Sequence, residues 1–458
     1  MTTTTAEPVG LWSNTRYLLW LISDTSKGLA ASLAGFAIPL IALVVTNDPA
    51  QTGIIAGIGM VTRLLTTLYG GVLADRHGRL ALMLLGAAVA GILAGGFTLL
   101  AFADALTFAT ILVVEVLLMA HSGLFDPAGE SALKEIVPDG TMGRAQAANQ
   151  GRDAALRLAG GPLGGLLLGV GAWLVGVVMT LAYALAGVTA WVLRRSARRA
   201  GITDRPADAE ANAGSTENEG PADPDADAGD PRSPASATAP VDAKPNAWHE
   251  IRDGFVWLFS RPDLRGVLLL TTVINLGFNA AMTTVVYGLQ QSGHSELTIG
   301  SISAGLGAVM LVGALIAPAL VPRVKAGTLT IAGLIAATAG AAIVSVVENP
   351  WWITAVLGAS VFLLPALNAS MMGYFMVATP TELLGRANSA AGVLGMGAMP
   401  LAPLIAGFGL ALVGRQNTIL FAAALCAVSV ALAITNRALR ALPSEAGWAA
   451  HAKQFEIR

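Results

Sequence analysis

Residues 18–45 read LLWLISDTSKGLAASLAGFAIPLIALVV, and this run decides the fold. It is longer than the roughly 20 apolar residues that a helix needs to cross the hydrocarbon core of a bilayer. Two charged residues, Asp24 and Lys27, stand three positions apart inside it. Because charge is unfavourable in lipid, such side chains face a bundle interior and pair with other groups. The run therefore predicts a membrane-spanning helix with a polar inner face.

The composition of the whole chain agrees with a membrane protein. Its 458 residues are 54% hydrophobic and only 12% charged, which is more apolar surface than one soluble core can bury. The single cysteine, Cys426, has no partner in the chain, which excludes an intrachain disulfide and a cysteine metal site. The first apolar run has no small-residue cleavage pattern behind a short core, so we expect it to remain as a span.

The same length criterion, moved along the chain, predicts twelve apolar segments in two groups of six. The first group covers residues 17–46, 51–74, 79–102, 106–130, 145–170 and 174–194. The second group covers residues 266–289, 298–321, 327–347, 352–377, 387–413 and 417–437.

A short repeat relates the two groups. VPDGTMGRAQAA at 137–148 and TPTELLGRANSA at 379–390 share a proline followed five residues later by Gly-Arg-Ala, and each opens the fifth segment of its group. In transporters, repeats of this kind place a site between two halves that rock against each other. The sequence therefore predicts an all-α integral membrane protein with twelve transmembrane helices in two pseudo-symmetric six-helix bundles, over residues 1–199 and 265–440.

Charge placement predicts the orientation of the chain. Lys and Arg concentrate in alternate connections, whereas the other connections hold only Arg415. Because cytoplasmic loops carry the excess of Lys and Arg, we expect a multi-pass cell-membrane protein with both termini in the cytoplasm.

The segments outside the two bundles have their own character. Residues 200–247 are rich in Ala, Pro, Gly and acids and are predicted to be a disordered acidic cytoplasmic linker, with a tether favoured over a partner-binding role. Residues 248–264 are predicted to be an interfacial amphipathic helix, because Trp248, Phe255 and Leu258 share one helical face. Residues 441–458 are predicted to be a cytoplasmic tail.

Two motifs resemble those of the major facilitator superfamily. GGVLADRHGRL, from Gly70 to Leu80, is similar to the signature loop between its spans 2 and 3. LAGGPLGGLLL resembles the span-5 motif of its proton-driven drug exporters, although Arg157 stands where that motif has glycine. FDPAGESALKEIVPD, GRAQAANQ and the long linker look most like the twelve-span branch of macrolide, tetracycline and siderophore exporters. The resemblance implies a proton antiporter and covers nearly the whole chain outside the linker.

The resemblance also implies two groups of site residues. Gly71 allows two helices to approach closely, and Asp75 can bond the start of span 11 or pair with Arg79. Pro162 breaks a helical hydrogen-bond ladder, so span 5 is expected to bend, whether for proton exchange or only as a structural kink. The conformational latch comprises Gly71, Asp75, Arg76, Gly78, Arg79, Asp126 and Glu130. The span-5 kink comprises Gly161, Pro162, Gly164 and Gly165.

Charged residues inside the predicted spans lie almost entirely in the first half. With a helical rise of 1.5 Å per residue, Glu115 in span 4 and Arg63 in span 2 are expected near the middle of the membrane. A carboxyl group beside a movable cation could load and release a proton in each cycle. We therefore predict Asp24 and Glu115 as proton-coupling residues with Lys27 and Arg63 as counter-ions; the alternative for each carboxylate is a permanent ion pair that fixes helix packing.

The second half offers flexible and aromatic side chains instead. Such residues suit a cavity that accepts varied apolar molecules. The predicted substrate cavity comprises Phe278, Tyr287, Phe362, Met372, Tyr374, Met376 and Met396.

The predicted function is proton-coupled antiport that exports amphipathic or hydrophobic small molecules, such as drugs, by alternating access. The expected partners are a small-molecule substrate, protons and membrane lipid, with no nucleic acid, metal or cofactor, and a monomer is expected. No phosphate-cradling loop, metal spacing or Ser/His/Asp set is present, so an enzyme is not expected. The alternatives are a dedicated exporter or flippase of one endogenous compound, such as a siderophore or lipid, and a membrane sensor that does not transport.

Overall fold

The computed structural model describes residues 11–137, 139–199, 247–380 and 383–455, and every regular element within them is a helix. The first half contains η1 (Leu11–Ser13), α1 (Thr15–Thr46), α2 (Pro49–Arg76), α3 (Arg79–Phe102), α4 (Phe108–Ile136), α5 (Asp139–Val170) and α6 (Ala172–Arg199). The second half contains α8 (Ala247–Ser260), α9 (Pro262–Gln291), α10 (Glu296–Leu320), α11 (Ala326–Val344), α12 (Pro350–Val361), α13 (Leu364–Ala378), α14 (Leu384–Gly397), α15 (Leu401–Thr435), α16 (Arg437–Arg440), η3 (Glu445–Gly447) and α17 (Trp448–Lys453). The predicted linker lies outside the described residues except for its last position.

Several helix starts follow from local capping chemistry. The side chain of Asn14 accepts hydrogen bonds from the first backbone N–H groups of α1. Asp48 does the same for α2 and Asn349 for α12, and each of these two is followed by proline at the first helical position. Side-chain acceptors satisfy N–H groups that have no intrahelical partner, and proline has no N–H to satisfy. These short polar segments therefore separate the apolar runs.

Ten stretches of the described chain are long and apolar enough to cross a membrane. The charged helix α5 is not among them, and the last two predicted segments fall in one stretch, Ala390–Thr435. Gly414, with a φ of 79°, interrupts the helical backbone inside that stretch. The described chain therefore has ten to twelve apolar helices, depending on how α5 and the Gly414 break are treated.

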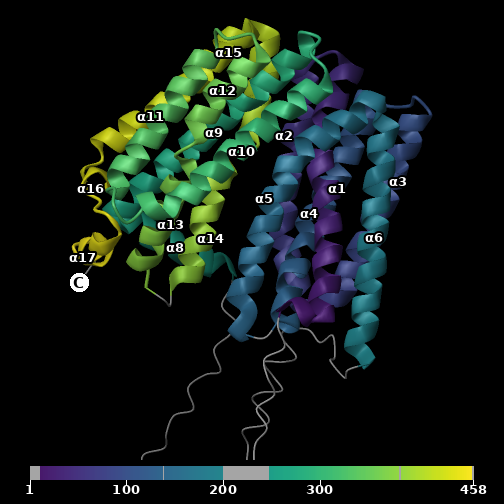
Figure 1. Ribbon diagram of the computed structural model, residues 1–458, viewed down its shortest axis with the longest axis horizontal. Helices are drawn as coiled ribbons and strands as arrows, with labels where there is room; N and C mark the ends of the chain where they lie inside the picture. Colours follow the sequence, from purple (N-terminus) through teal and green to yellow (C-terminus); the bar gives the residue numbers. More distant parts are fainter. Residues whose placement is uncertain (1–10, 138, 200–246, 381–382, 456–458) are drawn as a thin grey trace, which may run out of the picture.

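The two halves of the chain lie side by side and meet at one end (Figure 1). We call that end the far end, and we call the opposite end, where α6 stops at Arg199 and α8 begins at Ala247, the linker end. Two helix crossings join the halves, α5 with α10 and α2 with α15. A Cβ atom built on Gly300 would lie 2.3 Å from the carbonyl oxygen of Gly161. One built on Gly407 would lie 2.3 Å from that of Pro49, so glycine permits both close approaches.

Buried apolar side chains strengthen the contact at the far end. Leu40 of the first half belongs to a core cluster that is otherwise built from the second half. Leu43, Tyr287 and Ala406 form a smaller cluster across the same boundary. The halves are therefore packed together by apolar contact at the far end.

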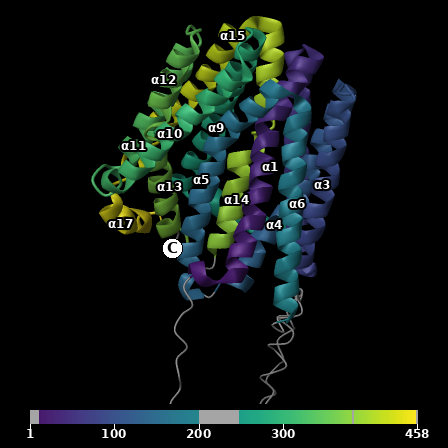
Figure 2. The same cartoon turned by 45° about the vertical axis from the view of Figure 1, so that its right-hand side comes forward.

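The segments predicted as an interfacial helix and a cytoplasmic tail both pack against the core of the second half. In α8 the side chain of Leu258 is fully buried and Phe255 packs against the same core cluster. The side chain of Trp248 lies outside the described residues. The predicted tail contains η3 and α17, and α17 lies against α13 with Trp448 buried (Figure 2).

Candidate functional site

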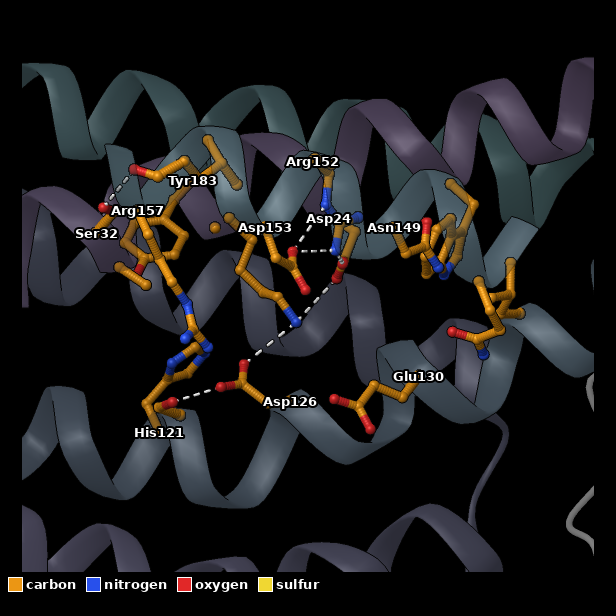
Figure 3. A pocket seen from close by; sticks show the side chains of 18 of the residues that line it. Asp24, Ser32, His121, Asp126, Glu130, Asn149, Arg152, Asp153, Arg157 and Tyr183 are labelled. Atoms are coloured by element: carbon orange, nitrogen blue, oxygen red, sulfur yellow. Dashed lines mark hydrogen bonds and ion pairs between the residues drawn. The ribbon is translucent and has the colours of Figure 1, made fainter. Parts of the chain in front are cut away.

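A cavity of about 570 Å³ opens among helices of the first half, mainly α1, α4 and α5. Trp20, Leu133, Leu156 and Tyr183 supply apolar surface to its wall. Charged side chains converge on it from several helices (Figure 3). These are Asp24, Lys27, Arg63, Asp126, Glu130, Arg152, Asp153 and Arg157.

A chain of ion pairs crosses this cavity. The Lys27 ammonium lies 3.1 Å from the Asp24 carboxylate and 3.2 Å from the Asp126 carboxylate, which links α1 to α4. Nη2 of Arg152 lies 2.8 Å from Asp24 and 2.8 Å from Asp153, which links α1 to α5. The spacing of three residues places Asp24 and Lys27 on one helical face. We call Asp24, Lys27, Asp126, Arg152 and Asp153 the shared network, because Asp24 and both cations each have two partners.

Neighbouring side chains position the shared network. The guanidinium of Arg152 lies over the Trp20 ring, 5.6 Å from its centroid, a favourable cation–π arrangement. The indole N–H of Trp20 donates to the carbonyl of Gly129 at 2.9 Å, which fixes the ring between α1 and α4. The hydroxyl of Ser122 donates to the Asp126 carboxylate. Trp20 and Ser122 were not predicted as site residues, because single residues of these types carry no distinctive spacing.

Two polar atoms at the cavity have no hydrogen-bond partner within the described residues. They are Nη1 of Arg152 and Oδ1 of Asn149, and both are buried. A buried polar atom without a partner is unfavourable unless water or a ligand satisfies it. Arg152 and Asn149 are therefore available to contact a bound molecule.

The two predicted proton-coupling residues lie in different environments. Asp24 belongs to the shared network, whereas Glu115 is 6% exposed and does not line the cavity. Glu115 packs on α2, where a Cβ atom on Gly59 would lie 2.8 Å from its Oε1 atom. The predicted counter-ion Arg63 is 4.0 Å from Asp126 and is largely exposed. Among the described residues, Arg63 therefore pairs with Asp126 and not with Asp24 or Glu115, because Arg63 faces the part of α4 that lines the cavity.

The predicted latch residues are only partly described. The expected close approach at Gly71 is wrong, since a Cβ atom there would meet nothing within 4 Å. The close approach occurs at Gly70, where a Cβ atom would lie 2.2 Å from the Gly123 carbonyl oxygen. One position along a helix turns a side chain by about 100°, which accounts for the difference.

The remaining latch residues lie around the α2–α3 junction and the cavity. Arg76 ends α2, Gly78 is the N-cap of α3 and Arg79 begins α3. The side chain of Asp75 lies outside the described residues. Asp126 and Glu130 both line the cavity, and Asp126 belongs to the shared network.

The glycines predicted in span 5 lie at close helix contacts. Gly161 and Gly165 face the backbone of α10, and Gly164 faces the ring of Phe36 on α1. The helix α5 continues through Pro162 to Val170 without a break. The motif therefore brings α5 close to the other half, and the bend expected at Pro162 stays a prediction.

The residues predicted for a substrate cavity in the second half do not come together. None lines the 570 Å³ cavity. Tyr287 is buried in the far-end cluster, and Tyr374 is buried near the linker end, where its hydroxyl donates to Asp263 at 2.7 Å. Phe278 packs against a core cluster, and Phe362 caps the end of α12. The exposed members are Met372, Met376 and Met396. Residue type alone could not distinguish cavity, core and surface positions.

His121 lines the cavity and also connects helices. Its side chain is 5% exposed, and Nε2 lies 2.8 Å from the carbonyl oxygen of Gly86. The ring stacks on Phe125 and meets Tyr183 edge-on. His121 therefore connects α4 to α3 and α6 by ordinary contacts.

Comparisons with known proteins relate this chain to a family and to solved structures of transporters. The family model described as Major Facilitator Superfamily matches residues 25–403. No curated protein matches the chain. A bacterial homologue of the iron transporter ferroportin in an inward-facing state is similar, with 12% identity, a TM-score of 0.65, and coverage of 91% of this chain and 97% of that chain.

Two further solved structures have a similar fold. A bacterial homologue of the human lysosomal transporter Spinster, inward-facing and unoccupied, has 12% identity and a TM-score of 0.60, covering 96% of this chain and 97% of that chain. A POT family transporter in complex with 5-aminolevulinic acid has 12% identity and a TM-score of 0.63, covering 93% and 96%. The family match spans most of the chain, which therefore belongs to the major facilitator superfamily of membrane transporters and is an integral multi-pass membrane protein rather than an enzyme.

Proposed function

We propose that this chain is a proton-coupled antiporter of the cell membrane that exports amphipathic small molecules through twelve spans arranged as two six-helix halves. The observation that carries the proposal is the sharing of Asp24 between Lys27 and Arg152. When Asp24 takes up a proton, Lys27 keeps Asp126 and Arg152 keeps Asp153 as partners. Neither cation is then left alone in a poorly hydrated site, so protonation breaks ion pairs without isolating a buried charge.

The cavity lining supports an amphipathic cargo with a cationic group. An ammonium group of the cargo can bind Asp24 and Asp126 alongside Lys27, whose Nζ atom lies 3.1 and 3.2 Å from these two carboxylates. The apolar part of the cargo then lies against Trp20, Leu156 and Tyr183. Because a proton on Asp24 weakens cation binding there, cargo and proton compete for one carboxylate, and this competition is the physical basis of exchange.

The shape of the molecule supports alternating access. The halves are joined at the far end by the Gly161–Gly300 and Pro49–Gly407 approaches, whereas the cavity lies toward the linker end. With the basic connections in the cytoplasm, as the sequence predicts, this state faces inward. Glu115 remains a second proton-carrier candidate, because its carboxyl group is buried on α4 away from the shared network.

A transport assay in inside-out vesicles tests the proposal. With an acidic lumen, wild-type protein should accumulate cationic dyes, and collapse of the pH gradient should abolish the accumulation. Asp24→Asn should lower gradient-driven uptake at least tenfold. Glu445→Gln is the matched control, since Glu445 is exposed on η3 far from the cavity, and it should transport like the wild type.

Three results would contradict the proposal. Uptake that survives collapse of the pH gradient would exclude proton antiport. Full gradient-driven exchange by both Asp24→Asn and Glu115→Gln would exclude these two carboxyl groups as carriers. Failure to move any compound of a broad panel, combined with a change in signalling, would favour the sensor alternative.

A further inference from the structure

A second hollow, of about 560 Å³, lies at the linker end of the second half between α9, α16 and α17. It belongs to neither the first cavity nor the transport proposal. Arg265 and Arg437 both line it, from different helices. Both side chains are exposed, and within the described part of the chain neither forms an ion pair. Two cations without an acidic partner therefore face one hollow.

A buried imidazole also lines this hollow. His451 is 7% exposed, and its Nε2 atom is buried with no hydrogen-bond partner among the described residues. The ring makes a hydrogen bond with the backbone of Ala438, so the unpartnered nitrogen is the other potential donor. A polar atom buried in this way calls for a ligand or water that can bond it.

The walls of the hollow are held by specific contacts. The side chain of Asn436 accepts from the backbone N–H of Leu439 at 3.1 Å, which orients α16 and Arg437. A Cβ atom on Gly266 would lie only 1.9 Å from the Asn436 amide nitrogen, so this side chain packs directly on the backbone of α9. Nη2 of Arg261 donates to the carbonyl of Ala452 at 3.3 Å and ties α17 to the start of α9. These contacts hold α9, α16 and α17 in fixed positions around the hollow.

The position of the hollow matches the level of lipid headgroups. Arg265 lies within the first turn of α9, a candidate span, and Arg437 stands two residues after Thr435, the last residue of α15, which is also part of a candidate span. Leu269, one turn deeper on α9, is 45% exposed and faces the same hollow. Phe455 adds an aromatic wall. Paired cations at the headgroup level, above exposed apolar surface, are the features that bind an anionic phospholipid.

We propose that this hollow binds the phosphate group of an anionic phospholipid, with Arg265 and Arg437 paired to the phosphate, His451 Nε2–H donating to it, and Leu269 against the acyl chains. Binding joins α9 to α16 and α17, so the lipid holds the C-terminal segment against the second half.

Protonation of His451 accompanies binding. Burial lowers the pKa of His451, although the nearby Asp263 carboxylate and the Ala438 hydrogen bond act in the opposite direction. The charged and titratable groups around the ring are Arg261 and Asp263 at the start of α9, Tyr374 on α13, and the two pocket arginines. A phosphate adds negative charge and favours the protonated ring. Binding should therefore strengthen as the pH falls toward 6.

Lipid titration of the purified full-length protein in detergent tests the proposal. The probes are dioleoyl-phosphatidylglycerol, dioleoyl-phosphatidylcholine and inorganic phosphate, with bound lipid counted by native mass spectrometry. Phosphatidylglycerol should bind more tightly than phosphatidylcholine. Arg265→Gln and Arg437→Gln should each weaken it about fivefold, and His451→Gln should remove the strengthening at low pH.

The matched control is the double variant Arg198→Gln/Arg199→Gln, which removes the same charge from the end of α6. It should retain phosphatidylglycerol binding within about twofold. Wild-type binding by the Arg265→Gln/Arg437→Gln double variant, with an unchanged thermal transition, would overturn the site. Equally tight binding of inorganic phosphate and phosphatidylglycerol would overturn the lipid assignment.

Discussion

Two charged regions of this molecule use the same residue types in opposite ways. In the second half, Arg261 donates to both oxygens of Asp263, at 3.0 and 2.9 Å, and Tyr374 adds a third hydrogen bond. Both charged side chains are only 2% exposed. In the shared network of the first half, Asp24 is 12% exposed and Lys27 26%, and each has two ionic partners.

The difference separates a structural clasp from an exchangeable site. In the Arg261–Asp263 pair, two N–H groups of Arg261 and the Tyr374 hydroxyl all donate to one buried carboxylate, so neutralising that carboxylate weakens three hydrogen bonds at once. In the shared network, a partner remains when one acid is neutralised. A carboxyl group that changes protonation in each cycle needs the second arrangement, and it occurs beside the 570 Å³ cavity.

Asp263→Asn should have the largest effect on stability. The change keeps the side-chain shape but removes the buried negative charge that accepts from Arg261 and Tyr374, and we expect a loss of about 3–5 kcal/mol in unfolding free energy. Chemical unfolding in detergent measures it, with Glu445→Gln as the control. A loss near zero would show that the pair is not a clasp.

Asp24→Asn makes the same chemical change in the shared network and should destabilise the protein by only about 1 kcal/mol. Lys27 and Arg152 retain Asp126 and Asp153, so no cation is isolated. The variant should fold normally while it loses gradient-driven transport. A stability loss equal to that of Asp263→Asn would erase the contrast between the two regions.

Acidic pH should loosen the C-terminal segment by less than about 1 kcal/mol. Because burial lowers the pKa of His451 below its usual 6.5, the neutral ring stabilises the docked α17 above that pH. This stabilisation is lost as the pH falls below 6.5, when undocked chains take up the proton first. Hydrogen exchange of residues 448–453 in lipid-free detergent measures the docking. His451→Gln is the matched variant, and identical pH dependence in both chains would contradict the assignment.

Arg63→Gln should have the smallest effect, within about 0.5 kcal/mol of wild-type stability. Its side chain is 57% exposed and lies 4.0 Å from Asp126, so solvent screens the pair. Unfolding in detergent and dye transport measure the two consequences. A severe loss of transport would restore Arg63 as an essential counter-ion.

Part of the candidate site was predictable from spacing along one helix. Asp24 and Lys27 were recognised as a pair, because three residues bring two side chains to one face of α1. The second partners, Asp126 on α4 and Arg152 on α5, depend on how three helices are rotated against one another. Hydropathy does not encode that rotation, which is also why Gly70 rather than Gly71 makes the close approach.

The sequence by itself determined the helices and their approximate limits, because span length and capping residues are properties of one continuous stretch of chain. Its motifs indicated the family. The sequence also showed that the charged residues inside the predicted spans lie almost entirely in the first half, whereas the buried Arg261–Asp263 pair of the second half was not predicted. Only the tertiary structure decided the partners of each charge. Tyr374 bonds Asp263 instead of lining a cavity, and Glu115 lies against Gly59 outside the shared network. Contacts between helices depend on tilt and rotation in three dimensions, and residues far apart in the chain set both.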